Sequence, residues 1–346
     1  MKLCTFVVAT VAGRLERVGV VTAVGVIDAG AAREAFLSRS LSPAAAERVA
    51  TAQVPPDLTL IVGAGAAALD WVREAVDFVV GAGVAETASG RQIVYREDAI
   101  ALQAPIRRPP GIACFATWKA HIEDSAGKGF ALKFPAEGSE IRPYYKGNPD
   151  SVIGPESTLE FPAYAQALDV ECELAAVVGR GGKDLTPDQA QAAIAGYCIF
   201  NDVSVRDIQA REMELGLGPT KGKDQDAGNV FGPWLVTADE VGDPRDLTMA
   251  LWVNGVEWSS YPAAKMAWTF ADLLSYLSRG QTVHPGHLLT SGCFPGGSAL
   301  DMNRTLAAGD LIEMKISRLG TLRNRIGQAS GNAQAAMDFH ATGKIK

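Results

Sequence analysis

Beyond residue 111 the chain alternates short apolar segments with turn residues, and this pattern limits the possible fold more than any other feature. Leu247–Trp258 carries Asn254-Gly255 between β-rich flanks, which predicts a type I′ hairpin. Helices are predicted from Thr186–Gln189, which has the residues of a capping box with proline at the first helical position, and over Trp268–Ser278. Strands joined by hairpins with few helices between them predict a mainly β body with some α-helix, not a doubly wound parallel sheet.

The first hundred residues are rich in alanine and valine. Proline after Ser42 predicts a helix from Pro43, and Pro55-Pro56 predicts a turn that leads into a strand over Leu58–Val62. The strongest break before the midpoint is Pro109-Pro110-Gly111. We therefore predict a small α/β N-terminal domain over residues 1–105 and a second domain over residues 106–346.

Composition and charge exclude several classes of function. With 47% hydrophobic and 21% charged residues, the 346-residue chain has the balance of a folded globular protein. A net charge of −7 predicts no nucleic-acid partner. No apolar run reaches the ~20 residues that cross a bilayer, and the N-terminus lacks a signal-peptide layout, so we expect a cytoplasmic protein with no membrane partner. The five cysteines show neither disulfide-framework nor C-x-x-C spacing, which fits a reducing compartment.

Two motif-like patterns carry little weight. Gly63-Ala64-Gly65 with Ala68 makes a G-x-G-x-x-A pattern, but no clean second strand follows to complete the βαβ unit of a dinucleotide site. His284 and His287 flank a Pro-Gly turn, and a zinc site would need further histidine or cysteine ligands nearby. We expect neither kind of site.

Two glutamates interrupt an otherwise apolar strand pattern over Asp169–Val178. Side chains two residues apart in a strand point to the same face, so Glu171 and Glu173 lie on the same side. Adjacent carboxylates repel each other and are costly to desolvate. Either a hard cation such as Mg²⁺, Mn²⁺ or Ca²⁺ binds them, or the strand lies at an edge with both glutamates in water. Asp202 ends the next apolar strand, where a helical hairpin would return it beside the glutamates, and this favours the cation.

Lys223 follows Gly222 in a loop that ends at Gly232-Pro233. Its ammonium could neutralise a substrate carboxylate or a developing enolate as a point charge. A solvated loop lysine is the alternative.

Several ordered motifs occur at compatible spacing along the second part of the chain. They are Tyr145–Pro149, Ser151–Pro155, Glu171-x-Glu173, Asn201–Gln209, Gly222-Lys223-x-x-Asp226, Gly232-Pro233 and Leu288–Gly292. Through them the chain resembles the fumarylacetoacetate hydrolase family over roughly residues 103–327. The resemblance implies a mixed β-roll catalytic domain preceded by a small α/β domain, a divalent cation held by Glu171, Glu173 and Asp202, and a homodimer.

The resemblance also implies roles for single residues. His121 matches the histidine that activates water, and Glu313 matches the acid that orients it; Asp124 is a second possible orienter. Without the resemblance, His121 is one residue of an amphipathic helix, and strand alternation could place Glu313 in water. The implied substrate contacts are Tyr145, Arg206, Gln209 and Lys223.

Two cysteines depart from the family pattern. Cys114 stands where longer members place a fourth metal-binding aspartate, and because thiols are poor partners for hard cations we predict only three protein ligands. Cys293 stands at a substrate-binding position where threonine is common, which would weaken a hydrogen bond to the substrate. Both departures affect substrate identity more than reaction class.

The expected activity is hydrolytic cleavage of a carbon–carbon bond in a 1,3-diketo acid, such as an acylpyruvate, with Mg²⁺ as the first choice of cation. His121 would take a proton from water, Glu313 would fix the imidazole, and Lys223 would offset the developing charge. A 2-oxo acid hydratase, isomerase or decarboxylase on the same scaffold is the first alternative, and a binding protein that retains the fold is the second. Ala116–Ala131 has the glycines that a mobile lid would use.

Overall fold

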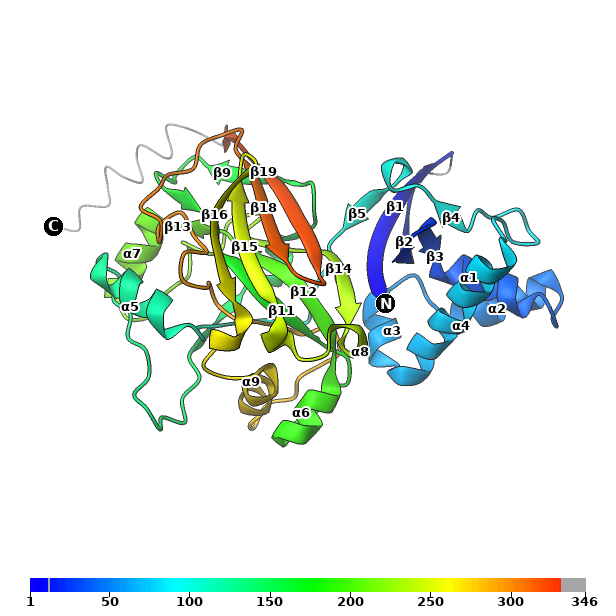
Figure 1. Cartoon of the computed structure of the whole chain (residues 1–346), viewed down its shortest axis with the longest axis horizontal. Helices are drawn as coiled ribbons and strands as arrows, with labels where there is room; N and C mark the ends of the chain where they lie inside the picture. The colour runs from blue at the N-terminus through cyan, green and yellow to red at the C-terminus, as the bar shows by residue number, and fades with distance from the viewer. Residues whose placement is uncertain (12, 331–346) are drawn as a thin grey trace.

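The computed structural model describes residues 1–11 and 13–330; residues 331–346, the end of the predicted second domain, lie outside the described residues. Figure 1 shows a smaller part, coloured blue to cyan, beside a larger β body that holds the remaining described residues. Among the described residues, no helix is long and apolar enough to cross a bilayer.

The smaller part combines an antiparallel sheet with a group of helices. Its long strands are β1 (Lys2–Thr10), β2 (Gly13–Thr22) and β3 (Gly25–Asp28), which pair in sequence order. Asp28 begins the first helix, and its carboxylate accepts the Ala31 N–H at 2.8 Å. The remaining elements are α1 (Ala29–Leu37), α2 (Pro43–Gln53), α3 (Leu58–Gly63), α4 (Ala66–Ala82), β4 (Val94–Tyr95) and β5 (Ala101–Gln103).

The helix predicted from Pro43 is confirmed as α2, but the strand predicted over Leu58–Val62 is wrong, since this segment is helix α3. Asp57 caps α3 by accepting the Thr59 N–H at 2.8 Å. Leu58, Ile61 and Val62 are buried at helical spacing in one core cluster. Packing of this face outweighs the β-branched character of the segment. The G-x-G-x-x-A pattern therefore joins two helices, which is not the strand-to-helix turn of a dinucleotide site.

One mixed sheet runs through both parts of the molecule in the order β4-β3-β2-β1-β14-β12-β11-β17-β6-β7, with β5 on β1 and β8 on β14. The antiparallel pair β1–β14, with Lys2 opposite Val236, joins the two parts. The boundary predicted after residue 105 falls between β5 and β6 and stays a prediction. The strands of the larger part in this sheet are β6 (Ile112–Phe115), β7 (Tyr144–Gly147), β8 (Val152–Ile153), β11 (Cys172–Val178), β12 (Ile194–Asp202), β14 (Asn229–Thr237) and β17 (Leu288–Thr290).

A second sheet, ordered β16-β15-β18-β19-β9, packs on the first. The predicted hairpin is confirmed: Asn254 and Gly255 have φ values of 52° and 76° between β15 and β16. Its strands are β9 (Thr158–Pro162), β15 (Thr248–Val253), β16 (Val256–Pro262), β18 (Leu311–Ile316) and β19 (Gly320–Ser330); β10 (Leu168–Asp169) and β13 (Ser204–Val205) form a small separate pair.

The larger part contains the helices α5 (Lys119–Gly127), α6 (Pro187–Ala193), α7 (Arg206–Glu214), α8 (Ala238–Val241) and α9 (Phe270–Leu277). In Figure 1, helices α6, α8 and α9 lie at the lower ends of its strands, and α5 and α7 lie at its left side. The capping box predicted at Thr186 is confirmed, and so is a helix within Trp268–Ser278. A mainly β fold with α-helices is therefore confirmed.

Strand β11 is buried on both faces. Leu174 and Ala176 share a core cluster with Met314 of the second sheet, whereas Ala175 and Val177 belong to the core built with the N-terminal helices. Because both faces are covered, the alternative of an edge strand with its glutamates in water is wrong. Any charged side chain on this strand must find its partners inside the protein.

Candidate active site

Three acidic side chains converge where β11 begins and β12 ends. The antiparallel pairing sets Cys172 opposite Asn201, and the Asp202 N–H donates to the Glu171 carbonyl at 3.2 Å. Glu171, Glu173 and Asp202 are only 6%, 1% and 2% exposed, and their carboxylate oxygens can lie within 4.8 Å of one another. The structure thus brings together the three side chains that the resemblance nominates as metal ligands.

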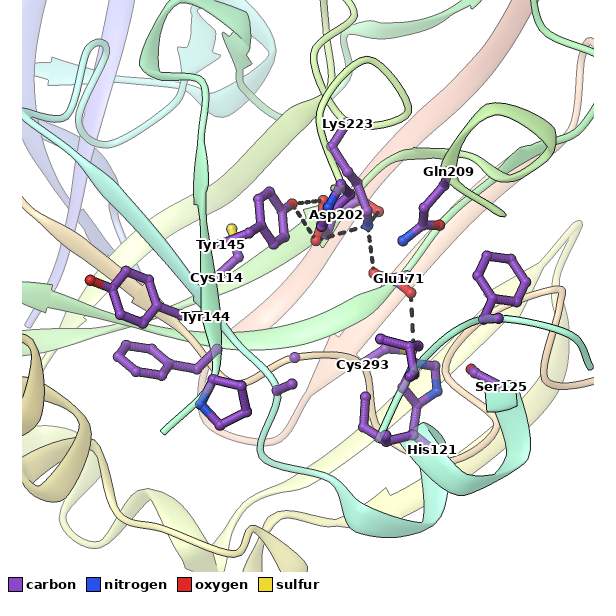
Figure 2. Close-up of a pocket in the computed structure, with 18 of the residues that line it drawn as sticks. Cys114, His121, Ser125, Tyr144, Tyr145, Glu171, Asp202, Gln209, Lys223 and Cys293 are labelled. Atoms are coloured by element: carbon purple, nitrogen blue, oxygen red, sulfur yellow. Dashed lines mark hydrogen bonds and ion pairs between the residues drawn. The ribbon is translucent and has the colours of Figure 1, made fainter. Parts of the chain in front are cut away.

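Two buried cations, Lys223 and Arg206, form ion pairs with this cluster, and Figure 2 shows Lys223 between Asp202 and Glu171. Lys223 Nζ lies 2.8 Å from Glu171 Oε2 and 2.9 Å from Asp202 Oδ2. Arg206 donates from Nη2 to Glu171 Oε1 at 2.8 Å and from Nε to Asp169 Oδ2 at 2.8 Å. Lys223 is therefore no solvated loop residue, and Arg206 and Lys223 both have carboxylate partners within the protein.

The carboxyl groups respond differently to these neighbours. Burial alone would raise the pKa of Glu171, but Arg206 and Lys223 outweigh it and hold that pKa below its usual range. Glu173 has no ion-pair partner among residues 1–11 and 13–330; burial, and then the charges of Asp202 and Glu171, raise its pKa well above the usual range. Burial also raises the pKa of Asp202, although Lys223 opposes the shift.

The donor set fits a divalent cation. Glu173 is a buried carboxyl group that accepts the Gly292 N–H at 3.1 Å and forms no ion pair within the described residues. A bound cation would supply a counter-charge and would meet only hard oxygen donors, as Mg²⁺ and Mn²⁺ prefer. Cys114 does not add to this set, because burial, and then the charge of Asp202, raises the pKa of its thiol well above the usual range.

His121 lies on the other side of Glu171, on helix α5 (Figure 2). Its Nε2 is 3.7 Å from Glu171 Oε1, and its Nδ1 is 2.9 Å from Asp301 Oδ2. The same Asp301 oxygen accepts the Gly296 N–H at 2.8 Å, which fixes the carboxylate. With Asp301 accepting from Nδ1–H, the lone pair of Nε2 is left to act as a base beside the acidic cluster.

Glu313 does not reach His121, so the predicted His121–Glu313 pair is corrected. Strand β18 alternates, with Ile312 and Met314 buried in the core. Glu313 therefore points to the opposite face, where its Oε2 lies 3.7 Å from Lys315 Nζ. The orienting partner that the structure shows instead is Asp301.

Asp124 is not the orienter either, because its exposed carboxylate accepts from Lys128 Nζ at 2.6 Å. Sequence reasoning missed Asp301 because it lies 180 residues from His121 in the chain. Asp169, the buried partner of Arg206, was likewise given no role. No local pattern singled out either aspartate.

A cavity of about 220 Å³ opens beside the acidic cluster. The predicted substrate-contacting residues Tyr145, Arg206, Gln209 and Cys293 all line it. The Tyr145 hydroxyl lies 2.7 Å from each carboxylate oxygen of Asp202 and donates to that group. Helix α5 closes one side of the cavity; that this segment moves as a lid stays a prediction.

Helix α7 and the loop that follows it hold the cations in place. Arg206, at the start of α7, donates to Gln209 Oε1 at 2.9 Å. Near its other end, the Glu212 carboxylate accepts the backbone N–H groups of Lys221 at 2.6 Å and Gly222 at 3.0 Å. These bonds fasten the loop directly before Lys223 to the helix that carries Arg206.

Comparison with known proteins places this fold and site in one family. Residues 111–327 match the fumarylacetoacetate (FAA) hydrolase C-terminal family, and the chain belongs to that family. A curated relative, the 2,4-didehydro-3-deoxy-L-rhamnonate hydrolase of Sphingomonas sp. (strain SKA58), is 38% identical over 180 residues, 51% of this chain and 62% of that protein. The chain thus spans about three fifths of the length of the curated relatives it matches.

Two solved structures share the fold at modest identity. The fumarylacetoacetate hydrolase from Exiguobacterium antarcticum is 26% identical, with a TM-score of 0.67 over 95% of this chain and 100% of that one. A fumarylpyruvate hydrolase from Pseudomonas aeruginosa, solved with Mn²⁺ and pyruvate, is 27% identical, with a TM-score of 0.56 over 65% of this chain and 91% of that one.

Proposed function

We propose that the protein is a divalent-cation-dependent hydrolase that cleaves a carbon–carbon bond in a 2,4-diketo acid of the acylpyruvate type. The observation that carries the proposal is the pair His121–Asp301, whose free imidazole nitrogen faces Glu171 of the acidic cluster at 3.7 Å. The name of the Sphingomonas relative supports it, since it describes an acid oxidised at C2 and C4 on either side of C3.

Glu171, Glu173 and Asp202 would hold the cation, with Mg²⁺ as our first choice and Mn²⁺, bound by the Pseudomonas neighbour, as the second. When bound, such a cation acts as a Lewis acid toward the two carbonyl oxygens of a diketo acid and orients them. Removal of cations by a chelator, followed by addition of Mg²⁺, Mn²⁺ or Ca²⁺, tests this choice through recovery of activity.

His121 supplies the base in this scheme. Its Nε2 takes a proton from water as the water oxygen bonds to C4, while Asp301 keeps Nδ1–H in place and stabilises the imidazolium that forms. The C3–C4 bond then breaks, its electron pair passes to C3 as an enolate, and the imidazolium returns the proton. The products are pyruvate and a carboxylic acid.

Lys223 and Arg206 supply positive charge beside the reacting atoms. Both are buried, at 4% and 8% exposure, so water screens their charges poorly. Charge that develops on the substrate oxygens forms next to these fixed cations, and the surrounding protein does not need to reorganise.

The replacement His121→Ala tests the proposal. We expect the rate of acylpyruvate cleavage, followed by loss of enol absorbance, to fall at least about 10²-fold, the usual value of a positioned base. Asp124→Asn, on the exposed side of the same helix, is the matched control and should keep the wild-type rate. An unchanged rate in His121→Ala would remove the histidine from the scheme.

The same assay separates the alternatives. Identification of the products by NMR distinguishes hydrolysis, which gives two acids, from hydration, isomerisation or decarboxylation. Absence of turnover across an acylpyruvate panel with Mg²⁺ or Mn²⁺ would favour a binding protein. The homodimer implied by the family resemblance is tested separately by light scattering.

A further inference from the structure

The active-site cavity has two chemically different ends. Its charged end is formed by the acidic cluster with His121, Arg206 and Lys223. Much of the rest of its lining is apolar and comes from three separate segments: α5, the stretch between α5 and β7, and α7 with the loop after it. We call this part of the lining the apolar end; its residues are Ile122, Phe130, Leu132, Met213 and Pro219.

In the part of the chain that the structure describes, no cation lines the cavity beyond the charged end. The lysine and arginine side chains that line it are Lys223 and Arg206, and both are held by carboxylates. Lys128 lies near but does not line the cavity, and its ammonium is bound to Asp124 and to two backbone carbonyls.

Arg142, next to lining residue Pro143, is also engaged, because its guanidinium lies 4.6 Å from the Trp268 ring centroid and donates to the Ser139 carbonyl at 2.7 Å. A second carboxylate on a substrate would therefore reach the apolar end without a counter-charge, and burial of an unpaired charge is strongly unfavourable.

Helix α7 shows how the chemistry changes along the cavity. Arg206, Gln209 and Met213 are spaced three and four residues apart, so they lie on one face of the helix, and all three line the cavity. Arg206 contacts the acidic cluster, Gln209 contacts Arg206, and Met213 lies one turn further on. A substrate whose diketo acid lies against the cluster would extend its acyl group toward Met213.

We propose that the physiological substrate carries an uncharged, apolar acyl group, either alkyl or aryl, so that its carboxylate at C1 is its only charged group. This inference rests on the proposed function and adds the substrate class to it. Among uncharged groups, a polyhydroxylated chain fits poorly, because hydroxyls along this wall would lose hydrogen bonds to water and regain few.

An isosteric pair of acylpyruvates tests the proposal with the wild-type protein. The acyl groups 4-methylpentanoyl and succinyl have nearly the same shape and differ by an isopropyl group in place of a carboxylate. With Mg²⁺ bound, we expect kcat/KM for 4-methylpentanoylpyruvate to exceed that for succinylpyruvate at least about tenfold. Equal values, or a preference for the dicarboxylate, would overturn the inference and leave the hydrolase proposal standing.

A variant of Met213 tests the cause of the preference. Met213→Arg places a cation on the apolar wall and should raise the succinyl-to-4-methylpentanoyl ratio of kcat/KM at least about tenfold. Met213→Gln has a similar length without the charge and should keep the ratio near the wild-type value. Equal ratios in the two variants would show that charge at this wall does not select the acyl group.

Failure of the hydrolase proposal would look different, since neither acid would then be turned over with any divalent cation. In that case, the affinities of the two acids, measured by calorimetric titration into the Mg²⁺-loaded protein, test the inference. Tighter binding of the 4-methylpentanoyl compound supports an apolar acyl site, and tighter binding of the succinyl compound overturns it.

Discussion

Nδ1 of His121 lies 2.9 Å from Oδ2 of Asp301, across 180 residues of chain. The aspartate is held in turn by the Gly296 N–H, so both partners of the imidazole–carboxylate pair have fixed positions. This contact selects which ring nitrogen carries the proton and leaves the other directed toward Glu171.

Replacement of Asp301 by asparagine should remove the charge that stabilises the imidazolium. We expect Asp301→Asn to lower kcat by about 10²-fold or more, with little change in the affinity for the divalent cation. KM should change little, because Asp301 contacts His121 and the Gly296 N–H and is not among the residues that line the cavity.

The control for this variant is Glu313→Gln. Since Glu313 lies on the face of β18 opposite the core, beside Lys315, its replacement should leave kcat and KM unchanged. A large loss of activity in Glu313→Gln together with a wild-type rate in Asp301→Asn would show that Glu313, and not Asp301, orients His121.

Binding of a divalent cation should stabilise the folded protein, because Glu173 is a buried carboxyl group that forms no ion pair with the residues the structure describes, and the charges of Asp202 and Glu171 lie close to it. At a cation concentration of 100 times Kd the gain is about 2.7 kcal/mol. We therefore expect Mg²⁺ or Mn²⁺ to raise Tm in differential scanning calorimetry and a chelator to lower it. Glu173→Gln should remove most of this response, whereas Glu257→Gln, an exposed site on β16, should retain it. A wild-type Tm that does not change with cation concentration would contradict the proposed metal site.

Close packing of Gly222 against α7 should make this position intolerant of a side chain. A Cβ at Gly222 would lie 2.8 Å from the backbone N and Cα of Gln209. We expect Gly222→Ala to force the Lys223 loop and α7 apart, with a loss of stability of about 1–3 kcal/mol and a loss of kcat/KM of at least about tenfold. In Gly81→Ala, on α4, the Cβ would meet nothing within 4 Å, so this control should keep full activity. Wild-type kinetics in Gly222→Ala would show that the contact does not position the loop.

Acid should destabilise the protein partly through His287. Burial, and then the neighbouring charges of His284 and Lys146, lower the pKa of His287 from 6.5 to about 4. As pH falls from 6.5 toward 4, the unfolded chain therefore binds this proton before the folded protein does, and stability is lost across that interval. We expect Tm to fall less steeply over this range in His287→Gln than in the wild type. His284→Gln should retain most of the wild-type slope, and equal slopes in all three proteins would exclude His287 as the cause.

Much of the local structure could be predicted from the sequence. The capping box at Thr186 and the hairpin at Asn254-Gly255 depend on interactions within a few residues, so spacing alone identifies them. The strand that carries Glu173 pairs with distant strands, but its apolar pattern was already visible in the sequence. The segment Leu58–Val62 shows the limit of this reasoning, because burial of one helical face against distant residues overrode its strand-like composition.

The sequence by itself predicted that Glu171 and Glu173 point the same way, because side chains two residues apart in an extended segment do so. The structure brings the two carboxylates together, although β11 begins only at Cys172. The sequence also placed Asp202 at the end of the neighbouring strand. Only the tertiary structure decided that Asp301, and not Glu313, lies beside His121, since that contact depends on how two sheets and a distant loop pack together. The alternation of β18 was visible in the sequence. Packing of the second sheet against β11 decided that the face with Ile312 and Met314 meets the core.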